Sequence, residues 1–202
     1  MVIAGCGGKH AMGPVDIPPG NTGETLVWSS EPQRPGWTLE EPSSANGTMF
    51  FVGISGNFAS EQSGREDAKR NAINSIVSYT GTLAKNKFEQ ARVSFGLESS
   101  VVDPTSSARI FEKQLAVNVA RQVKAKKWYI EKWQTPTGTA HRVFLLAEVP
   151  ESSVNDSLKD TAKGMAKKAE QQAKEASDEI AKKQAEKAAD FWKQMQEQGL
   201  TE

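Results

Sequence analysis

The chain has little of the residues that build catalytic and metal sites. Among its 202 residues there are one cysteine and two histidines. A single cysteine excludes an internal disulfide and a cysteine-based zinc site, because such sites need several ligands. The histidines, His10 and His141, have no Cys/His or Ser/His/Asp framework around them. We therefore expect no enzyme activity, no cofactor and no metal.

The chain also lacks an excess of either charge and a long apolar run. Its 25 basic residues are balanced by 25 acidic ones. This balance argues against a general nucleic-acid binder, whose affinity depends on surplus Lys and Arg. No run is long and apolar enough to cross a bilayer as a helix. An aromatic content of 7% indicates one modest core with long polar additions.

The one cysteine ends the run Ile3-Ala4-Gly5-Cys6, which has the aliphatic, small, small, Cys order of a lipobox. Small residues admit a signal peptidase to the scissile bond, and the thiol takes a diacylglycerol through a thioether. Five residues before Cys6 are too few for the charged and apolar regions of a signal peptide. We interpret residues 1–6 as the remnant of a lipoprotein signal, in a chain that is trimmed or whose start is assigned too late. The alternative is a stray cysteine in a frayed N-terminus.

Residues 7–35 resemble a flexible tether, because they are rich in Gly and Pro and show no apolar period. As a coil they would reach roughly 30 Å. Within them, Leu26-Val27-Trp28 is a candidate for local docking on the folded part. Pro35-Gly36-Trp37 then marks the start of a domain predicted over residues 36–152.

The segment from Thr48 to Leu83 predicts a strand, a glycine-containing turn and a helix. Aromatic and β-branched residues from Met49 to Ile54 favour a buried strand. A capping box of Ser63 and Glu66 predicts the start of the helix, and its apolar face is Ala68, Ala72, Ile76, Tyr79 and Leu83. The turn at residues 53–56 is either plain or a phosphate cradle. It lacks the third glycine of a dinucleotide-binding motif and the Gly-Lys-Ser/Thr of a P-loop. These absences favour a plain turn.

A second helix and a hairpin complete the predicted domain. Asp103-Pro104 is typical of a helix start, and apolar residues from Phe111 to Val123 recur every four positions. Residues 115–119 also alternate like a strand, but the longer four-residue period favours a helix. Trp128–Trp133 and His141–Val149 form a hairpin. The predicted fold class is α+β, with a small, mostly antiparallel three-stranded sheet and two helices on one face, followed by a long C-terminal helix.

Residues 153–202 are predicted to be an extended helical arm rich in Ala, Lys and Glu. Pairs four residues apart, such as Asp178–Lys182, favour a continuous helix over residues 154–198. Its thin apolar stripe is Leu158, Ala162, Met165, Ala169, Ala176, Ile180, Phe191 and Met195. The arm is either a solvated helix or a helix whose alanine seam packs on a partner or on its own copies. In both cases we expect it to add little to the stability of the domain.

Three weaker site candidates remain. Glu66 and Asp67 are a formal acid/base pair, although acidic residues favour a helix start in any case. His141 is more consistent with a structural or surface residue than with a catalytic base. A basic-aromatic stretch is a candidate interaction surface for anionic lipid, glycan or nucleic acid, or else a solvated helix end beside buried aromatics; its residues are Arg121, Lys124, Lys126, Lys127, Trp128 and Trp133.

Taken together, Pro35-Gly36-Trp37, FFVGISG at 50–56, REDAKRNAINSIVSY at 65–79, WYIEKW at 128–133 and RVFLLAEVP at 142–150 resemble the Lpp-twenty lipoprotein family, which is related to the N-terminal domain of flagellar assembly protein T. The resemblance covers roughly residues 35–150. It implies an envelope lipoprotein with an α+β domain and no known catalytic residues.

We therefore expect a non-catalytic protein that is anchored through lipid on Cys6. Gly7 rather than Asp after the cysteine favours the outer membrane, facing the periplasm. The expected partners are other envelope proteins or copies of the chain, reached through the arm, and no specific nucleic acid. The alternatives are a periplasmic enzyme of unknown reaction and a binder of anionic polymer through residues 121–133.

Overall fold

The computed structural model describes residues 23–198, and within them one antiparallel sheet has four strands in the order β1-β3-β4-β2. The strands are β1 (Thr25–Ser29), β2 (Thr48–Ile54), β3 (Lys124–Thr135) and β4 (Gly138–Pro150). The predicted hairpin is β3–β4, and β2 pairs with β4 as expected. The prediction of three strands is wrong, because β1 lies inside the segment predicted to be a tether and adds a fourth strand on β3.

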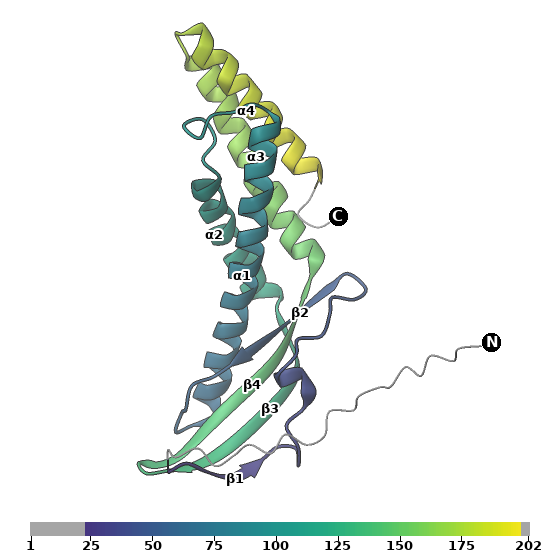
Figure 1. The fold of residues 1–202 in the computed structure, drawn as a ribbon, viewed down its shortest axis with the longest axis vertical. Coiled ribbons are helices and arrows are strands. Elements are labelled where there is room, and N and C mark those ends of the chain that lie inside the picture. The colour runs from purple at the N-terminus through teal and green to yellow at the C-terminus, as the bar shows by residue number, and fades with distance from the viewer. Residues whose placement is uncertain (1–22, 199–202) are drawn as a thin grey trace, which may run out of the picture.

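The same described part of the chain contains four α-helices and a short 3-10 helix, η1 (Gly36–Thr38). The helices are α1 (Glu61–Ser94), α2 (Pro104–Gln122), α3 (Glu151–Glu175) and α4 (Glu179–Gln198). The lower half of α1 covers one face of the sheet, and its upper half extends beyond the sheet beside α2 and the α3–α4 pair (Figure 1). The molecule is therefore elongated, with the sheet at one end and the α3–α4 turn at the other.

Local signals explain where the first two helices begin. Ser60, rather than the predicted Ser63, caps α1, and its Oγ accepts from the Ser63 amide at 3.1 Å. The predicted start of α2 is confirmed, because the Asp103 side chain accepts from the Thr105 amide at 2.9 Å and Pro104 is the first helical residue. Residues 115–119 are helical, as the longer apolar period indicated.

The face of the sheet under α1 is the main core. Val143, Leu145, Ala147 and Val149 alternate along β4 and are buried with residues of α1 and α2, such as Ile76 and Leu115. Helix and sheet approach closely at Gly53, where an added Cβ would lie 2.0 Å from the Ala68 carbonyl oxygen. Glycine is therefore needed near the end of β2 to let α1 lie this near.

The single long C-terminal helix is a wrong prediction. The helix stops at Glu175, and the Asp178 side chain caps α4 by accepting from the Ala181 amide at 2.8 Å. The chain then turns back, so that α4 runs antiparallel beside α3 (Figure 1). Ser-Asp before a helix-forming run is a cap signal, and it overrides the favourable spacing of Asp178 and Lys182.

The C-terminal helices also belong to the main core, contrary to the expectation of a weakly stabilising arm. Phe191 and Trp192 of α4 are 0% and 2% exposed. The Trp192 ring centroid lies 5.2 Å from that of Phe88 in α1, and the Phe191 centroid lies 5.7 Å from that of Phe95, which caps the end of α1; both pairs meet edge-on. Along the rest of α3 and α4, alanines allow the two helices to pack closely. The alanine seam is thus used within the chain.

Candidate functional site

The structure does not bring the predicted basic-aromatic surface together. Trp128 pairs with Leu145 on the face covered by α1, whereas Trp133 pairs with Ala140, and no register shift separates the two tryptophans. Successive strand residues point to opposite faces, so two residues an odd number of positions apart lie on opposite sides of the sheet. Arg121 belongs to α2 and not to the sheet. The stretch is therefore not one continuous surface.

The tryptophans and one lysine of this stretch already have partners within the molecule. The Arg65 guanidinium lies over the Trp128 ring at 4.7 Å, and that of Arg142 over the Trp133 ring at 5.3 Å. Lys126 lies over the Phe50 ring at 4.1 Å and forms a 3.8 Å ion pair with Glu148. Lys124 and Lys127 are exposed on β3. This arrangement supports the structural interpretation of the aromatics.

The second face of the sheet carries a buried charged cluster that sequence analysis missed. Glu131 in β3 is 1% exposed and accepts from Arg34 Nε at 2.8 Å and from Trp133 Nε1 at 3.0 Å. Arg34 also lies over the Phe144 ring at 5.0 Å. The sequence feature that could have revealed this cluster is the position of Glu131 among aromatic residues in a predicted strand. A glutamate that is buried there needs a cationic partner. The pairing holds the connection between β1 and η1 against the sheet.

The glycine turn before α1 is a structural turn. The Gly56 amide, which a bound phosphate would need, donates to the Asp67 carboxylate at 3.1 Å. Asp67 also forms a 3.5 Å ion pair with Arg70, and Glu66 accepts from Gln62 at 2.8 Å. A carboxylate at the glycine amide would repel an anion. Asp67 therefore holds the turn onto α1, and the phosphate-cradle interpretation is not supported.

His141 joins the turn to the sheet through its backbone. Its amide and carbonyl exchange hydrogen bonds with those of Phe58, at 2.6 and 3.0 Å. The imidazole Nδ1 is buried and has no hydrogen-bond partner in the part of the chain that is described. Glu66 and Asp67 are instead bonded to Gln62, Gly56 and Arg70, so the structure does not join these three acid/base candidates into one group within the described residues.

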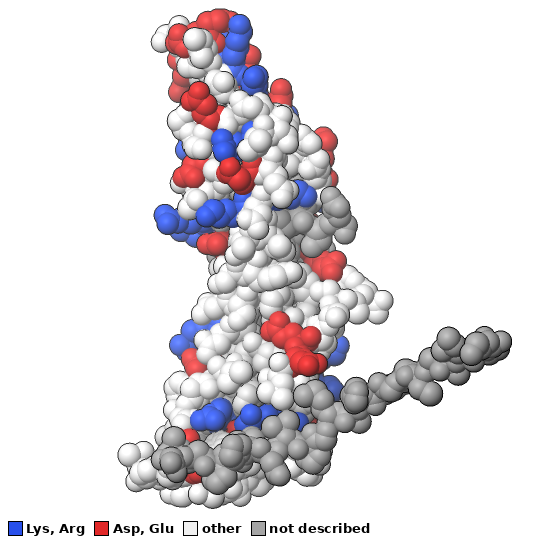
Figure 2. Space-filling model, in the orientation of Figure 1, with Lys and Arg blue, Asp and Glu red and all other residues white. Residues whose placement is uncertain are grey.

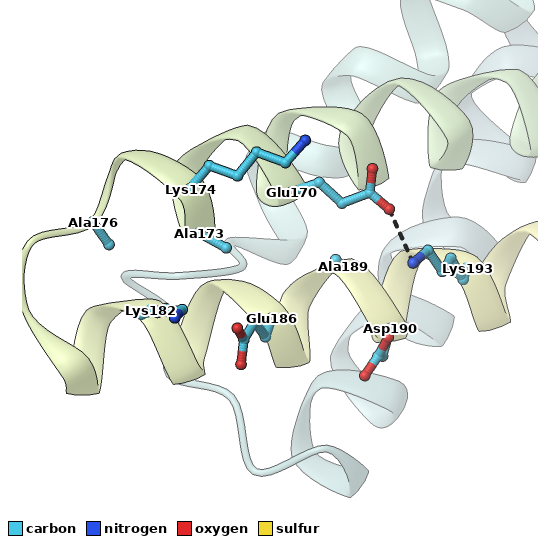
Figure 3. Close-up of a pocket in the computed structure, with 9 residues that line it drawn as sticks. All are labelled: Glu170, Ala173, Lys174, Ala176, Lys182, Glu186, Ala189, Asp190 and Lys193. Carbon is cyan, nitrogen blue, oxygen red and sulfur yellow. Dashed lines mark ion pairs between the residues drawn. The ribbon is translucent and has the colours of Figure 1, made fainter.

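A groove of about 510 Å³ lies between α3 and α4 near their turn. Figure 3 shows side chains from both helices around it, with Glu170 of α3 directed at Lys193 of α4 across a 2.9 Å ion pair. The hydrogen bond from Lys193, and then its charge, lower the pKa of Glu170 below its ordinary value of 4.5. Three lysines and three acids line the groove in equal number. It does not select a ligand of either charge.

Two findings concern metals and membranes. Within residues 23–198, no three His, Cys, Asp or Glu side chains come together as a metal site. In the same range, no helix is both long enough and apolar enough to cross a membrane. Cys6, the predicted lipid attachment site, and His10 lie outside the described residues.

Comparisons with protein-family models, curated proteins and solved structures found no match to this chain. The class that the fold itself defines is an α+β protein whose four-stranded antiparallel sheet is extended by a bundle of helices.

Proposed function

We propose that this chain is a lipid-anchored envelope protein without catalytic function, which works by contacting other envelope components. The observation that carries the proposal is the run Ile3-Ala4-Gly5-Cys6, because it places the only cysteine of the chain where a lipobox requires one. Two or more acyl chains on that residue would anchor the protein stably, whereas one chain would hold it only marginally. Gly7 after the cysteine favours the outer membrane.

The shape of the molecule supports this role. The described chain starts beside β1 at the sheet end, and the α3–α4 turn lies at the opposite end (Figure 1). An anchor attached before β1 would leave the helical end free to contact partners. Figure 2 shows acidic and basic side chains mixed over that end. A mixed-charge surface of this kind suits a protein partner better than a polyanion.

The mass of the native N-terminus tests the proposal. We expect cleavage before Cys6 and a mass increase from acyl chains. Cys6→Ala should move the protein from the membrane fraction to the soluble fraction without changing its circular dichroism, since the core described for residues 23–198 does not include this residue. His10→Ala, in the same segment but outside the lipobox, should remain with the membrane. An unmodified Cys6 in a soluble native protein would contradict the proposal.

A further inference from the structure

The strand β1 exposes an apolar rim at the sheet end of the molecule. Leu26, Val27 and Trp28 are 40%, 53% and 51% exposed. Leu26 pairs with Trp133 and Trp28 with Lys132, with a register shift at Val27 between them. Trp133 and Lys132 are adjacent residues, so Leu26 and Trp28 lie on opposite faces of the sheet. Together with Val27, these side chains surround the outer edge of β1, which pairs with no other strand within residues 23–198.

We propose that this rim, defined by Leu26, Val27 and Trp28, rests on the surface of the lipid bilayer. The inference depends on the lipid anchor proposed above. Residues 7–22 join Cys6 to the first described residue, Gly23, and span at most roughly 60 Å at about 3.5 Å per residue. β1 is the first described element after Cys6, so the rim is the part of the described fold nearest in the chain to the proposed anchor.

The chemistry of the rim fits a bilayer interface. The sequence of β1, TLVWS, has no charged residue, so its insertion among headgroups would bury no charge. Tryptophan is enriched at membrane–water interfaces because its ring is largely apolar and its N–H finds polar partners there. Unpaired sheet edges are usually protected by lysine, proline or a covering segment. Within Thr25–Ser29, neither of those residue types is present.

The geometry of β1 disfavours the other occupant, a strand from a second copy. Added strands bind an edge through a regular series of main-chain hydrogen bonds. The strand has only five residues and is irregular at Val27. A bulge bends an edge and interrupts its pairing, leaving few consecutive positions for a partner strand. A fluid surface needs no such register and accepts side chains that point in different directions.

The experiment uses the unacylated full-length chain, attached through the Cys6 thiol to a maleimide-bearing lipid in phosphatidylcholine vesicles. Cys6 is the only cysteine, so the attachment is specific. It also imposes the anchor, so that a failure of docking is distinguishable from a failure of native lipidation. The readout is quenching of tryptophan fluorescence by brominated phosphatidylcholine. We expect quenching in the wild-type chain and loss of most of it in Trp28→Phe.

A second pair of variants separates docking from simple proximity. Leu26→Ser with Val27→Ser keeps Trp28 and should reduce its quenching. Val93→Ser with Ile180→Ser removes apolar groups that are 64% and 72% exposed on helices, and quenching should not change. Circular dichroism must be equal in all variants. Equal quenching in wild type and Trp28→Phe would overturn the proposal. A dimer in solution that Val27→Ser dissociates, without lipid quenching, would overturn it in favour of a second copy.

Discussion

At the scale of single residues, two glycines three positions apart, at the end of β2 and in the turn after it, have different roles. Gly53 lies under α1, where a Cβ would meet the Ala68 carbonyl oxygen at 2.0 Å and the Ala72 amide nitrogen at 2.8 Å. Both are backbone atoms and cannot rotate away. A Cβ on Gly56 would meet only a side-chain carbon of Phe58, at 3.7 Å. Motif-based reasoning treats these glycines alike, whereas the packing distinguishes them.

We predict that Gly53→Ala destabilises the protein by about 3 kcal/mol or more, at the upper end of the cost of overpacking, because α1 must move away from the sheet. Gly56→Ala should change stability by no more than about 0.5 kcal/mol, since its amide still donates to Asp67. Urea unfolding followed by circular dichroism measures both free energies. Equal stability of the two variants would contradict the close approach of α1.

At the scale of secondary-structure elements, the pair α3–α4 shows how a composition argument can fail. The predicted stripe contains Ile180, which is 72% exposed, and Phe191, which is fully buried. Both residues belong to α4, where eleven positions are about three full turns, so they share one face of the helix. Phe191 packs on Phe95 next to the end of α1, whereas Ile180 follows the turn at the far end of the pair. The capping side chain of Asp178 sets the turn. The Ala and Lys content of residues 153–202 correctly predicts helical structure, but it does not show whether the segment forms one helix or two.

The ion pair between Glu170 and Lys193 gives a test of the antiparallel arrangement of α3 and α4. Because Lys193 lowers the pKa of Glu170, the pair stabilises the folded state above the ordinary pKa of 4.5. This contribution is lost as the pH falls through the lower, folded-state pKa. We predict that Lys193→Met raises the pKa of Glu170 toward 4.5, as measured by carbon NMR titration of the carboxyl group.

Lys187→Met is the matched control for that titration, because Lys187 is on the same helix but does not line the groove. It should leave the Glu170 midpoint where it is in the wild-type protein. An unchanged midpoint in Lys193→Met would mean that α4 does not fold back beside Glu170, as in the single-helix arrangement.

At the scale of the whole molecule, sheet and helices share one hydrophobic core. One buried cluster contains residues of the strands β2, β3 and β4 and of all four helices. We predict that Trp192→Ala destabilises the molecule by about 3–5 kcal/mol, the usual cost of removing a buried large aromatic ring. Because Leu145 of β4 belongs to the same cluster as Trp192, hydrogen exchange of β4 amides should also become faster, although the sheet lies at the opposite end of the molecule from the α3–α4 turn (Figure 1).

Ile180→Ala is the control for this prediction, because its side chain is 72% exposed and the change should be within about 0.5 kcal/mol. If Trp192→Ala left exchange in β4 unchanged, the boundary predicted near residue 152 would separate two independent units.

The sequence predicted β2, β3 and β4 because each combines aromatic or β-branched residues with clear turn signals. It did not predict β1, because Leu26, Val27 and Trp28 are adjacent and point in different directions, which no alternating pattern describes. The sequence also did not predict the Arg34–Glu131 ion pair, because the two residues are 97 positions apart in the chain. The sequence also did not show that Trp128 and Trp133 of the basic-aromatic stretch lie on opposite faces of the sheet, because neighbours in a strand alternate between the two faces.

The far end of the molecule is a turn between two paired helices, and the last part of this pair extends beyond α1 and α2 (Figure 1). Its seam is made of alanines such as Ala173 and Ala185. Matching seven-residue insertions in α3 and α4 would keep such a seam in phase and lengthen the pair by about 10 Å at 1.5 Å per residue. The sheet and the rest of the core would be unaffected. The reach of the molecule is thus an adjustable dimension that evolution or design can change without altering the fold beneath it.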